Sequence, residues 1–448
     1  LTDGLSVKTH SGKVLKARKT IVELLMASHP DDCLYCRRRT SCELLHLAEG
    51  LGVEQRGVRK KVHVGIKDVA NPAIIRDPEK CILCGRCVRV CEEVQGVSAI
   101  DFIGRGASTV VGAAFNDSLN LSSCINCGQC VKVCPTGALM ENPQIQKVLA
   151  ALSDPEKVVV VQHAPAVSVT VGELFGISAG EDLQGAMTAA LRHLGFDWVF
   201  DTSFSADLTI MEEASELVHR ITTGGTLPLM TSCSPGWVKF VEHFYPSFVD
   251  NLSSCKSPQQ MLGAVVKSHW AARQELDPSS IYHVAVMPCT AKKYEASKPE
   301  MVTGTTPDID AVLTTRELAQ MFRMAGINLS RLSPEACDNP FGERSSAGKL
   351  FGATGGVMEA AIRTAHHMVT GENMKRPVVS EVRELGGIKE APVRMGDLTV
   401  NVAVAQGLKN AARILDEVAA GERQLHFLEV MTCPGGCIGG GGQPYETD

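Results

Sequence analysis

The segment "CINCGQCVKVCP" (residues 124–135) carries four cysteines separated by two, two and three residues, and a proline follows the last of them. The earlier segment "CILCGRCVRVC" (residues 81–91) has its cysteines at the same separations. Because the pattern C-x2-C-x2-C-x3-C occurs twice, the sequence indicates an internal duplication. Disulfide bonds are the simplest alternative use of these cysteines, but the spacing is too regular and a chain of 448 residues too long to need covalent staples.

The repeated spacing is typical of the bacterial two-cluster ferredoxin fold, in which the fourth cysteine of each run binds the other cluster. Three cysteines on one tight loop reach three irons of a cubane, and the helical turn that follows directs the fourth cysteine away. Zinc, the main competing metal, is rarely bound by three cysteines at these separations. The sequence therefore predicts two [4Fe–4S] clusters. One is assigned to Cys81, Cys84, Cys87 and Cys134, and the other to Cys91, Cys124, Cys127 and Cys130.

A third metal motif precedes these runs in "HPDDCLYCRRRTSC" (residues 29–42), which places His29, Cys33, Cys36 and Cys42 at H-x3-C-x2-C-x5-C. Taken alone, the motif leaves a zinc site and an iron–sulfur cluster close to even. Beside two ferredoxin-like clusters, a third electron-relay site is favoured. We therefore predict another [4Fe–4S] cluster with His29 as its fourth ligand, and the neutral imidazole should raise the potential of that cluster.

The bulk properties of the chain exclude several classes of protein. The net charge of −6 excludes a strongly basic nucleic-acid binder, and no apolar run approaches the roughly 18 residues that cross a bilayer. Residues 1–20 are basic but lack the apolar core of a signal peptide. We expect a cytoplasmic protein. Because the chain begins at Leu1 and not at Met, we also expect it to be a piece of a longer polypeptide.

Three regions differ in pattern, and we expect domains at residues 1–65, 66–150 and 151–448. The first is a small iron–sulfur domain and the second an α+β ferredoxin-like domain. In the third, apolar β-rich runs such as "HVAVMPC" (residues 283–289) alternate with segments of helical period, which predicts an α/β fold with largely parallel sheets. Nearly every run ends beside Cys, Pro or Gly, at the carboxyl ends of strands where α/β folds place their sites.

Six cysteines of the third region remain, and their context is distinctive although their spacing is not. "MPCTAKKYEA" (residues 287–296) holds Cys289 after a strand, and "EVMTCPGGCIGGGGQP" (residues 429–444) holds Cys433 and Cys437 before four glycines. Glycines of this kind let backbone approach a bulky ligand closely. With "TSCSPGW" (residues 231–237) and "FGATGGVMEAA" (residues 351–361), these segments make the whole chain resemble the [FeFe] hydrogenases. Members with this set of accessory sites usually start with a [2Fe–2S] domain, which we expect on a preceding segment.

The resemblance implies two lobes around parallel or mixed sheets that enclose an H-cluster, a [4Fe–4S] cubane joined through a cysteine to a two-iron unit with CO, cyanide and azadithiolate ligands. It makes Cys289, Cys433 and Cys437 cubane ligands, with Cys437 as the bridge, and makes Lys292 a hydrogen-bond donor to a cyanide. The residues that would line the two-iron unit are Ala164, Pro165, Pro258, Gln259, Met287 and Met431. Without the resemblance, the two methionines would be interpreted as ordinary core residues.

The same resemblance implies a proton route through Cys233, Glu213, Ser253, Glu216 and Arg220. Glu213 and Glu216 are three residues apart on an expected helix, so they share one face, and Arg220 lies one turn further. The alternative interpretation is a solvated helix face with a Glu216–Arg220 ion pair. The resemblance favours the proton route. It gives no role to Cys255 and Cys337, which we expect to be small buried residues.

In most of the family the motif at residues 231–237, which here begins Thr-Ser-Cys-Ser-Pro, reads Thr-Ser-Cys-Cys-Pro. The first cysteine of the family's motif relays protons and the second binds the cubane. The family's spacing between this ligand and the cysteine that corresponds to Cys289 places the ligand position at Ser234 and the relay position at Cys233. A serine alkoxide is a poor ligand because of its high pKa. Alternatively, Cys233 binds the cubane and Ser234 relays protons, which the preference of cubane irons for soft donors favours slightly.

The resemblance implies an enzyme that oxidises H2 or reduces protons reversibly and passes electrons through three [4Fe–4S] clusters. No nucleotide-binding glycine motif is visible, so ferredoxin or flavin- and NAD(P)-binding subunits are the expected electron partners, in a hetero-oligomer that could bifurcate electrons. The alternatives are a hydrogen sensor or a non-enzymatic electron conduit. Sensors typically lose the relay cysteine and carry a signalling module, whereas Cys233 is present. The intact cysteine motifs and the Glu213–Glu216 pair argue against a conduit.

Overall fold

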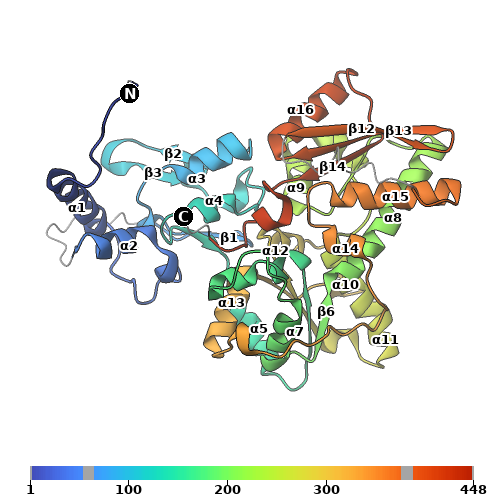
Figure 1. Ribbon diagram of the computed structural model, residues 1–448, viewed down its shortest axis with the longest axis horizontal. Coiled ribbons are helices and arrows are strands. Elements are labelled where there is room, and N and C mark those ends of the chain that lie inside the picture. The colour runs from blue at the N-terminus through green and yellow to red at the C-terminus, as the bar shows by residue number, and fades with distance from the viewer. Residues whose placement is uncertain (1–2, 54–64, 375–386, 446–448) are drawn as a thin grey trace.

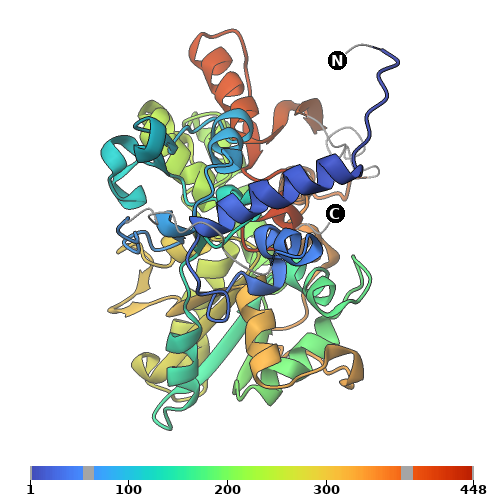
Figure 2. The same ribbon diagram turned by 90° about the vertical axis from the view of Figure 1, so that its left-hand side faces the viewer.

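The computed structural model describes residues 3–53, 65–374 and 387–445 (Figure 1). The chain starts with two helices, α1 (Gly12–Ala27) and α2 (Glu43–Gly50). The Ser11 hydroxyl caps α1 by accepting a hydrogen bond from the Val14 N–H at 3.4 Å. The two helices share a small apolar core, and Figure 2 shows α1 crossing the outside of this end of the molecule with α2 beside it.

Two pairs of short antiparallel strands accompany the duplicated cysteine runs. Strand β1 (Ile74–Arg76) pairs with β4 (Leu139–Glu141). Strand β2 (Asp101–Ile103) pairs with β3 (Val110–Gly112).

Each cysteine run makes the same backbone turn. Leu83 and Asn126, the second residues after the first cysteine of each run, have positive φ angles of 56° and 61°. Gly85 and Gly128 follow with φ angles of 72° and 70°. A helix then begins at the next residue, α3 (Arg86–Arg89) in one run and α4 (Gln129–Val133) in the other. Left-handed conformations at non-glycine residues are uncommon, so their recurrence at matching positions agrees with the predicted duplication.

The first large sheet has four parallel strands in the order β11-β8-β5-β6. Their bounds are Val158–His163 for β5, Trp198–Asp201 for β6, Ile281–Met287 for β8 and Ala311–Thr314 for β11. Helices α5 (Ile145–Leu152), α7 (Gln184–His193) and α13 (Thr315–Met324) pack their apolar side chains into one core with these strands. These strands and the two helices α7 and α13 confirm the predicted alternation of β-rich and helical segments.

The second large sheet is mixed, in the order β12-β13-β14-β7. Strands β7 (Leu229–Met230), β13 (Leu398–Gln406) and β14 (Phe427–Met431) are parallel, whereas β12 (Ile388–Met395) is antiparallel to β13. The sequence pattern did not indicate β12 because Pro392 and charged residues interrupt its apolar side chains. Its place at the sheet edge explains the proline, which cannot donate a hydrogen bond to a neighbouring strand.

Both faces of the second sheet are covered by helices. Val400, Val402 and Val404 of β13 face a core with α8 (Thr202–Thr223) and α15 (Gly356–Thr370). The alternate residues Ala403 and Ala405 face a core with α9 (Pro235–Phe244) and α16 (Leu408–Ala419). This two-sided burial explains why β13 is apolar without interruption from Val402 to Ala405.

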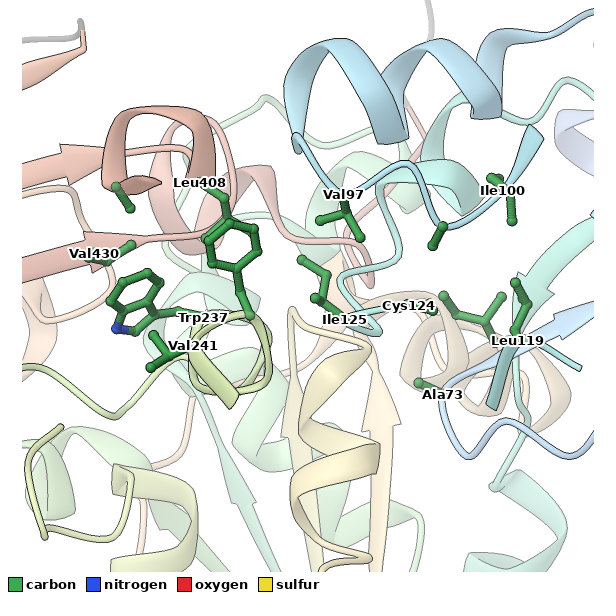
Figure 3. Close-up of a cluster of buried hydrophobic side chains, with 14 of the residues drawn as sticks. Ala73, Val97, Ile100, Leu119, Cys124, Ile125, Trp237, Val241, Leu408 and Val430 are labelled. Carbon is green, nitrogen blue, oxygen red and sulfur yellow. The ribbon is translucent and has the colours of Figure 1, made fainter. Parts of the chain in front are cut away.

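The core under α9 and α16 continues into the cysteine-rich region. Figure 3 shows Trp237, Val241, Leu408 and Val430 on one side of this cluster and Ile125, Val97 and Leu119 on the other. The ferredoxin-like region is therefore joined to the second sheet by buried apolar contacts. Among the described residues, no helix combines the length and apolar character needed to cross a membrane.

Leu408, fully buried at the start of α16, tests the contribution of this shared core. Replacing it by alanine should lower the free energy of unfolding by about 2–5 kcal/mol, because a buried leucine leaves a cavity that the surroundings fill only partly. Thermal unfolding followed by circular dichroism should show a lower midpoint. The matched control is Leu398→Ala on β13, where the side chain is 39% exposed, and a similar loss in both variants would contradict this prediction.

Candidate active site

A largely apolar cavity of about 120 Å³ lies where strands of both large sheets end. Ala164 and Pro165 follow β5, Met287 ends β8 and Met431 ends β14. Every residue that the resemblance assigned to the H-cluster lines this cavity: Ala164, Pro165, Cys233, Ser234, Pro258, Gln259, Met287, Cys289, Lys292, Met431, Cys433 and Cys437. The structure thus brings together residues that are far apart in the sequence. Thr432 and Phe351 also line the cavity, and the sequence analysis gave them no role.

Three thiols of this cavity are buried close to one another. Burial, together with the nearby Cys289 thiol, raises the pKa of Cys433 to about 12 and that of Cys437 to about 11. Burial likewise raises the pKa of Cys289, although Lys292 opposes the shift. A positively charged group bound by all three thiolates would remove this penalty, so the donor set suits a soft metal centre.

Lys292 is buried at the edge of the cavity and held by two contacts. Its Nζ donates to the Cys233 carbonyl at 3.0 Å and forms an ion pair with Glu295 at 2.9 Å. The same Glu295 carboxylate accepts hydrogen bonds from the Ser257 hydroxyl at 2.9 Å and the Gln259 amide at 3.1 Å. Glu295 therefore positions both Lys292 and Gln259. The i,i+3 spacing of Lys292 and Glu295 was a signal in the sequence that could have identified it.

The expected proton-route residues lie between the cavity and the outer part of α8. The Ser253 hydroxyl donates to Glu216 at 2.8 Å, and Arg220 pairs with Glu216 at 2.7 Å. Glu213 is fully buried, so its side of the helix is not a solvated face, although the ion pair expected by the alternative interpretation is present. Burial raises the pKa of Glu213 to about 8, and the charges of Glu216 and Glu429 add to the shift.

Cys233 and Ser234 both line the cavity but have different neighbours. Burial raises the pKa of the Cys233 thiol, the Glu213 carboxylate raises it further, and Lys292 opposes the shift. The Ser234 hydroxyl instead lies 2.8 Å from the Thr432 hydroxyl, and Ser234 is the residue that precedes α9. Cys233 is thus on the Glu213 side of the cavity and Ser234 on the Cys433 side.

The duplicated runs enclose two further cavities. One is lined by Cys81, Cys84, Cys87 and Cys134, and the other by Cys91, Cys124, Cys127 and Cys130. These are the two sets that the ferredoxin spacing predicted, with the fourth cysteine of each run exchanged. Cys127 also lines the main cavity, so the second set and the main cavity share a wall.

The His29 motif (residues 29–42) lies against the ferredoxin-like region. His29 is buried, and the Cys33 and Cys36 thiols are near enough to Cys42 to add to the rise that burial causes in the Cys42 pKa. Arg38 donates to the Cys134 carbonyl at 2.8 Å, which fixes this loop beside the first cysteine set. Within the described residues, no group of three or more His, Cys, Asp or Glu side chains gathers tightly enough for a single metal ion.

The glycines near the C-terminus pack their backbone directly against the backbone of other loops. A Cβ on Gly441 would collide with the Cys127 carbonyl, and one on Gly440 would collide with the Pro288 carbonyl. The Gln129 side chain donates to the Gly439 carbonyl at 2.8 Å, and the Thr290 hydroxyl donates to the Asn126 carbonyl at 2.7 Å. The glycines therefore let three cysteine-bearing loops meet. Gly440 also lines the main cavity, so the close approach to a ligand that the sequence suggested stays a prediction.

Cys255 and Cys337, expected to be buried, are both partly exposed. Cys255 lies 4.0 Å from the Glu216 carboxylate, and burial together with the nearby Glu213 and Glu216 charges raises its pKa to about 12. Cys337 lies on the loop before α14 (Ser346–Leu350) and contacts His163. The sequence gave no sign of either contact, because each joins residues far apart in the chain.

Comparison with family models identifies three matches. Residues 157–441 match the iron-only hydrogenase large subunit, C-terminal domain. Residues 18–56 match the iron–sulfur binding region of NADH-ubiquinone oxidoreductase G, and residues 80–138 match a 4Fe-4S dicluster domain. The three matches follow the order of the metal motifs along the chain.

Known proteins with similar sequence or structure agree with these matches. The chain is 47% identical to the NADP-reducing hydrogenase subunit HndD of Solidesulfovibrio fructosivorans, over 100% of this chain and 77% of that protein. It is 43% identical to iron hydrogenase 1 of Clostridium pasteurianum, over 99% of this chain and 78% of the relative. An apo [FeFe]-hydrogenase HydA1 variant from Chlamydomonas reinhardtii superposes with a TM-score of 0.61 at 42% identity, covering 68% of this chain and 85% of that one. The chain therefore belongs to the iron-only, or [FeFe], hydrogenase family.

Proposed function

We propose that this chain catalyses reversible H2 oxidation and proton reduction at an H-cluster held in the main cavity. The observation that carries the proposal is that Cys289, Cys433 and Cys437 meet in one buried cavity, which the expected proton route also reaches. When bound, the H-cluster supplies the metal and the basic amine that split hydrogen heterolytically. The protein residues bind this group, exclude water from it and deliver protons and electrons.

The lining of the cavity fits such a group. Cys289, Cys433 and Cys437 supply soft thiolate donors, and the remaining lining is mostly apolar, so a bound cluster would be shielded from water. Lys292 and Gln259 are the polar groups suited to hydrogen-bond the outer ligands of the two-iron unit. Glu295 holds both of them at the edge of the cavity.

Protons would pass from the cavity to the surface through Cys233, Glu213, Ser253, Glu216 and Arg220. Because the pKa of Glu213 is about 8, this carboxyl group is mostly protonated at neutral pH but can lose its proton at small cost. Glu216 forms an ion pair with Arg220 and accepts a hydrogen bond from the Ser253 hydroxyl. The route therefore joins a group that exchanges protons near neutral pH to a fixed carboxylate nearer the surface.

Electrons would travel through the three accessory sites. The second ferredoxin-like set adjoins the main cavity through Cys127, and the His29 motif adjoins the first set through Arg38 and the Cys134 carbonyl. This gives the order His29 motif, first set, second set, main cavity. The match of residues 18–56 to an iron–sulfur binding region supports a [4Fe–4S] cluster over zinc at the His29 motif.

The electron partner is proposed from the relatives. HndD is named as an NADP-reducing hydrogenase subunit, and the N-terminal match is to a subunit of NADH-ubiquinone oxidoreductase. Both support a hetero-oligomer with NAD(P)-linked subunits, with ferredoxin as a second partner and electron bifurcation between them. A cytoplasmic location and a [2Fe–2S] cluster on a preceding segment complete this proposal.

The proposal is tested by infrared spectroscopy and hydrogen turnover of the metal-loaded protein with its co-purifying subunits. We expect bands from metal-bound CO and cyanide, together with rapid H2 oxidation and production. The absence of these bands would favour the electron conduit instead. Bands accompanied by very slow turnover would favour a hydrogen sensor.

The proton route predicts a large effect of Glu213→Gln. The amide cannot ionise, so H2 turnover should fall by about two orders of magnitude or more, while iron content and the infrared bands stay unchanged. The matched control is Glu212→Gln, because Glu212 precedes Glu213 on α8 but is exposed. Near-normal turnover in Glu213→Gln, or an equal loss in the control, would rule out this route.

The neighbours of Cys233 and Ser234 support Cys233 as the proton relay and Ser234 as the residue at the fourth cubane position. Cys233→Ser should then reduce turnover by about two orders of magnitude with little change in the cubane spectrum, because a hydroxyl of high pKa transfers protons poorly. Ser234→Cys should instead alter the cubane spectrum in electron paramagnetic resonance. A spectrum that changes in Cys233→Ser but not in Ser234→Cys would reverse the two roles.

A further inference from the structure

A second group of reactive side chains lies at the carboxyl ends of β5 and β6. It borders a polar cavity of about 450 Å³ that shares no lining residue with the main cavity. The lining includes Cys337, Gln184, Asp201, Asn339 and Arg344. The Cys337 thiol is therefore accessible to a small molecule although it is partly buried.

Three groups that can donate hydrogen bonds surround the Cys337 sulfur. The Thr188 hydroxyl oxygen lies 3.2 Å from it, His163 Nε2 lies 3.4 Å from it and Gln184 Nε2 lies 3.6 Å from it. A thiol can use only one of these groups as an acceptor for its single proton. A thiolate can accept hydrogen bonds from His163 and Gln184 together, and from Thr188 when that hydroxyl turns away from the Gln184 carbonyl 2.9 Å from it, so the arrangement favours the ionised sulfur.

The orientation of the Gln184 amide is fixed by charged neighbours. Its nitrogen donates to the Asp201 carboxylate at 2.9 Å, and its oxygen accepts from Arg344 at 3.5 Å. Arg344 and Asp201 also form an ion pair at 2.8 Å. Because the amide cannot be reversed without placing its oxygen against the carboxylate, its N–H group must point toward Cys337.

The surroundings of His163 determine which ring nitrogen carries the proton. Its ring is 1% exposed, and its Nδ1 atom has no hydrogen-bond partner. A proton on Nε2 gains a hydrogen bond to the Cys337 sulfur whereas a proton on Nδ1 would gain none, so the tautomer with the proton on Nε2 is favoured. That tautomer donates its proton to the Cys337 sulfur.

The electrostatics agree with this geometry. Burial alone would raise the pKa of the Cys337 thiol, but the contacts with His163, Thr188 and Gln184 lower it below its usual range. The pKa of His163 is raised, because Cys337, Asp201 and Asp182 outweigh the opposite effect of burial. The charged groups around the pair are Asp182, Arg192, Asp201, Glu335, Asp338, Glu343 and Arg344.

The loop that carries Cys337 is held against the sheet. The Asp338 N–H donates to the Val199 carbonyl at 2.8 Å, and the Val199 N–H donates to the Asp338 carboxylate at 2.8 Å. Arg192 pairs with both Glu335 and Asp338. The sulfur is therefore positioned by backbone and ion-pair contacts on both sides, and its alignment with the donors is built into the fold.

We propose that Cys337 is a redox modification site, at which a reactive thiolate supported by His163 forms mixed disulfides with low-molecular-weight disulfides. The sulfur attacks one sulfur of the incoming disulfide. A new bond forms between Cys337 and that sulfur, the original S–S bond breaks, and the second half leaves as a thiolate that takes a proton from solvent. Cys337 is oxidised and the small disulfide is reduced, so no other oxidant is needed.

The test uses the metal-loaded protein under anaerobic conditions with oxidised glutathione as the probe. Peptide mass spectrometry measures glutathione on Cys337 and on Cys255, the matched control, which is also partly exposed but surrounded by carboxylates. At pH 7.5 we expect Cys337 to react roughly tenfold faster or more, since only the thiolate attacks. Iron content measured afterwards checks that the clusters remain bound. Equal or slower reaction of Cys337 would overturn the proposal.

Two variants separate the proposed support from simple exposure. Thr188→Val and His163→Asn each alter the donors around the sulfur, and the pH midpoint of iodoacetamide alkylation at Cys337 should rise in both. The rate at pH 7 should fall roughly fivefold to tenfold. Cys337→Ser should remove the glutathione adduct and leave iron content unchanged. An unchanged pH midpoint in both donor variants would show that His163 and Thr188 do not support a thiolate.

Discussion

The meeting of three loops at the C-terminal glycine run is the constraint on which the site depends. The backbone of Gly440 and Gly441 packs against the carbonyls of Pro288 and Cys127, where a side chain would collide. Pro288 precedes Cys289, and Cys127 belongs to the second ferredoxin-like set, so this contact fixes the main cavity relative to its neighbour. Arg316 reinforces the junction, because it donates to the Gly441 carbonyl at 2.8 Å and forms a buried ion pair with Glu141 at 2.8 Å. The proposed electron path from the second ferredoxin-like set to the main cavity thus rests on backbone contacts that only glycine permits.

Burial sets the chemistry of the groups around this junction. It makes isolated thiolates unfavourable at Cys433 and Cys437, which is why the site suits a group that binds all of them together. Burial also raises the pKa of a carboxyl group on α8. Glu213 is fully buried near the like charge of Glu216 and keeps a proton near neutral pH, whereas Glu216, one turn further, is paired with Arg220. Two carboxyl groups on one helix face therefore have different surroundings, one buried and the other ion-paired.

The sequence could predict the parts of the structure that depend on local spacing. The gaps within each cysteine run predicted which thiols would share a cavity, and the apolar run at residues 283–289 predicted β8 where the structure has it. It could not predict β12, where Pro392 and charged residues hide an edge strand, nor the support that Glu295 gives to Gln259. Those features depend on which segments become neighbours after folding. The glycine run shows the limit well, since its composition indicated close approach but not that the approaching partner is backbone.

Cys255 and Cys337 show why residue type alone does not define a thiol's chemistry. Both are single cysteines outside every metal motif, and both are partly exposed. Cys255 lies among carboxylates that oppose a second negative charge, so its sulfur stays protonated and poorly reactive. Cys337 lies among groups that donate hydrogen bonds, brought together from β5, α7 and a loop more than a hundred residues further along the chain. The fold therefore separates an inert thiol from a reactive one by placing opposite charges and dipoles around the same side chain.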